Sequence, residues 1–129
     1  DTYPHMAYFD HVRRFAEAGY DWMEDGRYKG AIACRFSAFV EAGGYDERFE
    51  FYGAEDRELA ARLTRRRLKK ASLPMGSIGN FYTPDDVKMA NYRLKMTKQK
   101  SSELMRPYYE ESVTSGRLVA NPQGWGKWN

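Results

Sequence analysis

The sequence is poor in the side chains that build disulfides and metal sites, with one cysteine, Cys34, and two histidines, His5 and His11. A single cysteine excludes an internal disulfide and a cysteine-based zinc site. Cys34 lies in an apolar run, where we expect a small core residue. The two histidines fall on one expected helix but not on one face of it, so we do not expect them to chelate a metal.

Long apolar runs are also lacking. No stretch approaches the roughly 20 apolar residues of a membrane span, so we expect no transmembrane segment. The chain begins with Asp1 instead of Met, and no signal peptide precedes the first expected helix. We therefore interpret the sequence as a piece of a longer cytoplasmic protein, in which any membrane association would come from other parts.

Neither sign of charge is in large excess, because the chain has 21 Lys and Arg and 18 Asp and Glu, which gives a net charge of +3. Acidic residues are spread throughout and no nucleic-acid-binding motif is present, so we expect no nucleic-acid partner. The basic run 65–70 has two interpretations. It is either the solvated end of a helix, favoured by the helix dipole, or a site for a phosphate-bearing partner.

Apolar residues make up 42% of the chain and aromatic residues 16%, which indicates a globular domain. Aromatic side chains with a polar tip suit a sugar-binding groove, but they also fill ordinary cores. Both interpretations apply to the aromatic residues of the central loop, which are Tyr45, Phe49, Phe51 and Tyr52.

Periodicity predicts helices alternating with few strands. In the first half we expect an amphipathic helix over 5–18, with Met6, Phe9, Val12 and Ala16 on its inner stripe. A loop over 20–30, a buried strand over 29–35 and a short helix capped by Ser37 should follow. Gly43-Gly44 should end that short helix.

In the second half we expect a helix over 55–67, a strand over 71–75 and a loop over 76–82. Thr83-Pro84-Asp85-Asp86 predicts the start of a helix that continues to about residue 98. A further helical piece over 102–111 should be interrupted by Pro107, before an irregular tail over 121–129. So few strands do not complete an α/β sheet, so the rest of the sheet should come from another segment.

Two adjacent acids, Glu55 and Asp56, open the expected central helix directly after Gly53. The helix dipole favours their ionised form, and the glycine lets a ligand approach the backbone. A carboxylate fixed at the start of a helix is well placed to act as a general base. The alternative is that both acids only stabilise the helix start.

The acids belong to a longer motif, Gly43-Gly44-Tyr45-Asp46-Glu47-Arg48-Phe49 and then Gly53-Ala54-Glu55-Asp56-Arg57-Glu58-Leu59 with Arg62-Leu63. Together with the run 30–39, it resembles the acceptor-side motif of family 2 glycosyltransferases and of galactosyltransferase C-terminal domains. The resemblance covers residues 1–66, and more loosely reaches about residue 93. It implies an α/β fold, namely the helix-rich C-terminal part of a GT-A mixed sheet over 1–99, with a helical or irregular extension over 100–129.

The resemblance also implies a reaction, the transfer of a sugar from a nucleotide-sugar donor to a carbohydrate hydroxyl with inversion. Asp56 would be the catalytic base, and Glu55 would hold the acceptor hydroxyls in line. The residues implied to contact the substrate are Gly44, Tyr45, Asp46, Glu47, Tyr52, Gly53 and Arg62. Asp46 and Glu47 are also interpreted as braces of the loop.

Members of the family that the sequence resembles hold Mg²⁺ or Mn²⁺ through an Asp-x-Asp motif. Asp1 looks like the last aspartate of that motif. Many also have a downstream histidine at the metal, but Asn80 stands about where it would be here. The nucleotide-binding half would then be a preceding segment or another subunit. The competing hypothesis is a non-catalytic fragment that binds carbohydrate or protein and lacks that half.

Overall fold

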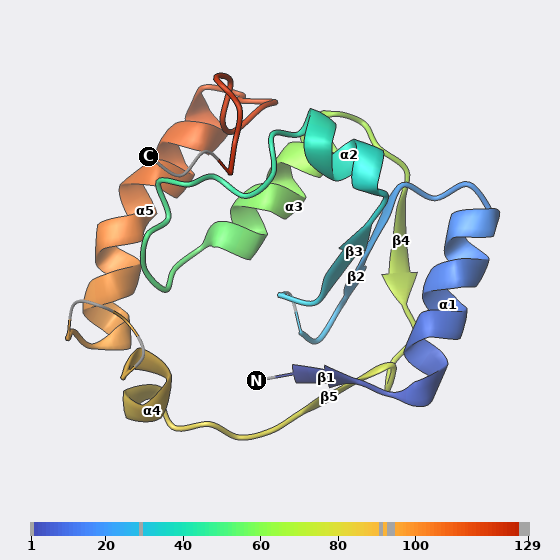
Figure 1. Ribbon diagram of the computed structural model, residues 1–129, viewed down its shortest axis with the longest axis horizontal. Coiled ribbons are helices and arrows are strands. Elements are labelled where there is room, and N and C mark those ends of the chain that lie inside the picture. Colours follow the sequence, from blue (N-terminus) through green and yellow to red (C-terminus); the bar gives the residue numbers. More distant parts are fainter. Residues whose placement is uncertain (1, 29, 91, 93–94, 127–129) are drawn as a thin grey trace.

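The computed structural model of the chain describes residues 2–28, 30–90, 92 and 95–126, which form a mixed α/β fold rich in helix (Figure 1). A three-stranded sheet in the order β3-β2-β4 lies at its centre, and a two-stranded ribbon pairs β1 with β5. The predicted fold class, helix-rich α/β with few strands, is confirmed.

The middle strand of the central sheet is β2 (Trp22–Asp25). It pairs antiparallel with β3 (Ile32–Cys34) and parallel with β4 (Lys70–Leu73). The strands predicted over 29–35 and 71–75 are thus confirmed, whereas the loop predicted over 20–30 is wrong for residues 22–25. Asp25 ends β2 and turns the chain, because its Oδ1 accepts hydrogen bonds from the backbone N–H groups of Arg27 and Tyr28.

The two faces of the central sheet are covered by different helices. On one face, α1 (Met6–Glu17) packs Tyr8, Val12 and Phe15 against Met23, Ala71 and Leu73. The helix predicted over 5–18 is confirmed, but its inner stripe is partly wrong. Met6 is 93% exposed and Phe9 65% exposed, because the face with Tyr8 and Phe15 meets the sheet instead.

On the opposite face, α3 (Glu55–Arg65) packs Leu59 and Leu63 against Trp22 of β2. This helix agrees with the prediction over 55–67. The short helix α2 (Phe36–Glu41) has Arg35 and not Ser37 at its N-cap position, since it begins two residues earlier than expected, and no side chain caps it. Gly43 and Gly44 end it with φ of 80° and 69°, a region that glycine adopts without strain.

The second half of the chain departs further from prediction. Residues 78–80 form strand β5 (Ile78–Asn80), which pairs with β1 (Thr2–Pro4), where a loop was expected. The helix predicted to reach residue 98 is only α4 (Asp85–Met89). Its one buried residue is Met89, while Val87 is 51% exposed, so little packing favours a longer helix.

The last helix, α5 (Lys98–Thr114), runs through Pro107 without interruption, contrary to the prediction. Thr97 caps it by accepting a hydrogen bond from the N–H of Lys100. Buried residues lie on both sides of the proline, with Met105 before it and Ser112 after it. This packing offsets the cost of the missing backbone hydrogen bond. The described part of the tail, up to residue 126, forms neither helix nor strand, as expected.

The basic run at the end of α3 is largely occupied by contacts within the fold. Arg65 donates to the carbonyl of Arg117, Arg66 pairs with Glu41 at 2.8 Å, and Lys70 pairs with Glu24 at 2.9 Å. The structure therefore favours the first interpretation of this run, the basic end of a helix, over a phosphate-binding site.

Candidate active site

The adjacent acids Glu55 and Asp56 are half-buried at the first turn of α3. Glu55 reaches back along the chain, and its Oε2 accepts a hydrogen bond from the N–H of Gly53 at 3.0 Å. Oδ1 of Asp56 accepts one from the hydroxyl of Tyr45 at 2.9 Å. The two carboxylates are thus fixed by groups from the preceding loop and remain partly open to solvent.

Burial changes the acidity of this cluster. It raises the pKa of Glu55, and the nearby charge of Asp56 raises it further. Burial also raises the pKa of Asp56, against which the hydrogen bond from Tyr45 acts. The pKa of Tyr45 is raised strongly, first by burial and then by Asp56, so its hydroxyl stays protonated and donates. A carboxylate with a raised pKa is a stronger base.

Two glycines shape the immediate surroundings of the acids. A Cβ added to Gly30 would lie 2.8 Å from Oδ2 of Asp56, so a side chain at residue 30 would cover that oxygen. A Cβ added to Gly53 would lie 2.5 Å from Cβ of Met105 on α5. Gly53 is therefore needed for α5 to approach the turn that bears the acids, whatever its part in substrate binding.

Other groups near the acids come from a part of the chain that the motif does not include. The ammonium of Lys98 lies 4.9 Å from the ring centroid of Tyr52, and Ser101 Oγ donates to the carbonyl of Tyr52 at 2.5 Å. The pKa of Tyr92 is raised by burial and then by the charge of Glu55. No local pattern in the sequence pointed to Tyr92 or Lys98.

Arg62, predicted to contact the substrate, lies in the core with 0% exposure, which contradicts that role. It pairs with Glu58 at 2.7 Å and donates to the carbonyls of Ala42 and Gly44. Ser112 Oγ donates to the same Glu58 carboxylate at 2.6 Å. Arg62 therefore fixes the glycine turn from beneath and cannot reach a sugar.

Asp46 is also enclosed, at 3% exposure, and pairs with Arg48 at 2.6 Å and with Arg117 at 3.4 Å. Its position fits a brace of the loop and not a contact with substrate. Glu47 is exposed, and its Oε1 accepts a hydrogen bond from the N–H of Gly126 at 2.7 Å. Glu47 thus ties the loop to the C-terminal tail.

The tail, residues 117–126, packs on the glycine turn. Nδ2 of Asn121 donates to the carbonyls of Gly43 and Tyr45, both at 2.7 Å. The ring of Trp125 lies 3.0 Å from the position of a Cβ on Gly44. The tail therefore occupies the space beside Gly44, which is not open to a ligand. The backbone of Tyr45, whose hydroxyl meets Asp56, is therefore held by a segment far away in the sequence.

A metal ion finds no ready-made set of ligands in the described residues. Across 2–28, 30–90, 92 and 95–126, no group of three or more His, Cys, Asp or Glu side chains could hold one. Asp1, the predicted ligand, lies outside the described residues. The ribbon pairs Thr2, the next residue, with Asn80. Mg²⁺ or Mn²⁺ as a cofactor therefore stays a prediction.

Within the part of the chain that the structure describes, none of the helices has the length and apolarity to cross a bilayer.

Comparison with known proteins gives one match. Residues 11–86 match a family model described as the N-terminal domain of galactosyltransferase. The matched stretch contains Gly30, Tyr45 and both acids, and it ends within α4, before α5 and the tail. Searches of curated proteins and of solved structures returned no match. The galactosyltransferase part of the sequence resemblance is thus supported, whereas membership of family 2 stays a prediction.

Proposed function

We propose, from the premise that this chain belongs to the galactosyltransferase domain family, that it carries the catalytic base and the acceptor site of a nucleotide-sugar glycosyltransferase. The observation that carries the proposal is the position of Asp56. It is half-buried at the start of α3, with Oδ1 bonded to Tyr45 and Oδ2 beside the bare backbone of Gly30.

In the proposed reaction, Oδ2 of Asp56 takes the proton of an acceptor hydroxyl as that oxygen attacks the anomeric carbon of the donor. The bond from that carbon to the diphosphate breaks, and the nucleoside diphosphate leaves with the electron pair. A single displacement of this kind inverts the configuration. General-base catalysis of this type supplies about 10²–10⁴-fold in rate.

The remaining groups of the site would orient the acceptor. Glu55, held by the N–H of Gly53, has oxygens that suit sugar hydroxyls, and the ring of Tyr52 suits the C–H face of a sugar. Holding a hydroxyl in line with the anomeric carbon lowers the entropic part of the barrier. We further propose that the surrounding fold is of the GT-A type, with the nucleotide bound largely by another segment or subunit.

The test is an assay of sugar transfer with nucleotide sugars, galactose donors first, and a set of glycoside acceptors, with product and free nucleoside diphosphate measured by mass spectrometry. Asp56→Asn keeps the shape and the hydrogen bond to Tyr45 but removes the base, so we expect kcat to fall by about 10²-fold or more. The matched control is Asp10→Asn, an exposed acid on α1.

A kcat for Asp56→Asn equal to that of the control would refute Asp56 as the base. If the chain together with its nucleotide-binding segment or subunit binds oligosaccharides by calorimetry but neither binds nor consumes a nucleotide sugar, the carbohydrate-binding hypothesis replaces the transferase.

A further inference from the structure

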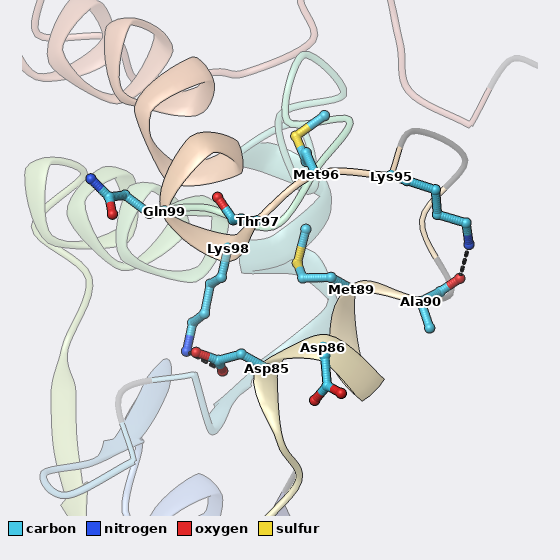
Figure 2. A pocket seen from close by; sticks show the side chains of 9 residues that line it. All are labelled: Asp85, Asp86, Met89, Ala90, Lys95, Met96, Thr97, Lys98 and Gln99. Carbon is cyan, nitrogen blue, oxygen red and sulfur yellow. Dashed lines mark hydrogen bonds and ion pairs between the residues drawn. The ribbon is translucent and has the colours of Figure 1, made fainter.

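A cavity of about 620 Å³ lies between α4 and the start of α5, outside the acid pair itself (Figure 2). Its size is within the range of pockets that hold small molecules, about 300–1,000 Å³. The side chain of Met89 points from α4 toward the segment at Met96, whose own side chain points away from Met89 (Figure 2). It is lined by Asp85, Asp86, Met89, Ala90, Lys95, Met96, Thr97, Lys98 and Gln99.

The chemistry of the lining favours an uncharged, apolar ligand. Met89 is 4% exposed, and a methionine side chain adapts its shape to apolar groups of different form. The charges of the lining are largely satisfied from within. Lys98 pairs with Asp85 at 3.1 Å, and the ammonium of Lys95 donates to the carbonyl of Ala90 (Figure 2). A charged ligand would have to compete with these contacts.

The cavity meets the loop before the acids at Lys98. Lys98 lines the cavity, and its ammonium also lies over the ring of Tyr52 in the loop before Glu55. Tyr52 in turn lies in the same turn as Gly53, whose N–H donates to Glu55. The contact between Lys98 and Tyr52 thus joins the edge of the cavity to the loop that precedes the acids.

We infer that this cavity binds the apolar aglycone of a glycoside acceptor, an alkyl or aryl group whose sugar presents its hydroxyl to Asp56. The orientation of the ligand rests on the proposed function, whereas the occupation of the cavity does not. The acceptor class is thus an amphipathic glycoside in place of a free sugar.

Binding is tested directly by NMR of the full chain labelled with ¹³C at the methionine methyl groups, titrated with n-hexyl β-D-glucopyranoside below its micelle concentration. We expect saturable shifts of the Met89 and Met96 signals with the hexyl glycoside and none with the methyl glycoside. Met6 and Met75, which are 93% and 90% exposed, serve as internal controls. Equal shifts at the controls, or no saturable shift at Met89 and Met96, would overturn the inference.

A variant gives a second test. Met96→Gln should weaken binding of the hexyl glycoside about ten-fold, the loss expected when contact equal to roughly two methylene groups is removed. Met75→Gln, at an exposed position, should bind like the wild type. The signals of buried Met23 and Met105 report whether Met96→Gln keeps the fold, and unchanged affinity in a folded Met96→Gln would contradict the inference.

Transfer kinetics separate this inference from the proposed function. The wild type should have a KM for a hexyl glycoside at least ten-fold below that for the methyl glycoside of the same sugar. If sugar transfer occurs but the two KM values are equal and the Met89 and Met96 signals do not shift, only the aglycone site is refuted. If those signals shift saturably but no sugar transfer occurs, only the proposed function is refuted.

Discussion

Replacing Arg62 by methionine probes the buried contact on which the glycine turn rests. The substitution keeps much of the aliphatic volume but removes the guanidinium that pairs with Glu58 and donates to the carbonyls of Ala42 and Gly44. Both side chains of the pair are 0% exposed, so the Glu58 carboxylate would remain buried with only Ser112 as a partner.

Loss of one member of a buried ion pair costs about 3–5 kcal/mol, because the remaining charge is left without compensation. For a chain of this length we therefore expect Arg62→Met to lower Tm by roughly 10–20 °C. The assays are urea unfolding followed by tryptophan fluorescence and thermal unfolding followed by circular dichroism. The control, Arg13→Met, breaks an exposed pair with Asp10 and should change the free energy of unfolding by less than about 1 kcal/mol.

A second variant separates charge from packing. Glu58→Leu combined with Arg62→Met leaves no buried charge in the pair, so it should recover part of the stability that Arg62→Met loses. If Arg62→Met is as stable as Arg13→Met, the pair is not sealed from water and the reasoning fails. If the double variant is less stable than Arg62→Met alone, the loss comes from shape and not from charge.

Two further substitutions test the turn that bears the acids. Asp56 has a higher pKa in the folded protein than in the unfolded chain, so its protonation favours the folded state. Its stabilising contribution to the free energy of unfolding is fully present below the unfolded pKa and is lost as pH rises through the folded pKa. We therefore expect Asp56→Asn to unfold at higher urea than the wild type at pH 7, with the difference vanishing toward pH 4, and a less stable variant at pH 7 would contradict this. Gly53→Ala should cost about 1–3 kcal/mol in thermal unfolding, because its Cβ would meet Met105, and stability equal to that of Gly26→Ala, where nothing lies within 4 Å, would refute the clash.

The sequence was sufficient for elements whose pattern is local. The start of α3 at Glu55 followed from acids after a glycine, and the end of α2 followed from Gly43-Gly44. Strand β2 was missed because its four residues, Trp22 to Asp25, mix polar and apolar letters, although both faces of the strand are covered. Strand β5 exists only through its pairing with β1, a contact that no local pattern encodes.

The candidate site divides in the same way. The sequence placed Glu55 and Asp56 at a helix start, but it could not distinguish a buried arginine from one that meets a ligand. Arg62 follows Glu58 by one turn of helix, a spacing found equally in exposed pairs. Lys98 was missed because only the packing of α5 against the loop around Tyr52 brings it to the site.

The C-terminal segment, which follows the stretch matched by the family, contacts the turn that carries Glu55 and Asp56. The family match ends in α4, yet the acid turn depends on residues beyond it. Met105 fills the space beside Gly53, Ser112 meets the buried pair under the glycine turn, and Asn121 holds the carbonyl of Tyr45. Since Tyr45 in turn bonds Asp56, a change in the tail reaches the proposed base through two hydrogen bonds and no mobile linker. The segment after the matched stretch therefore packs on the same turn that Phe39 and Arg62 support from within it.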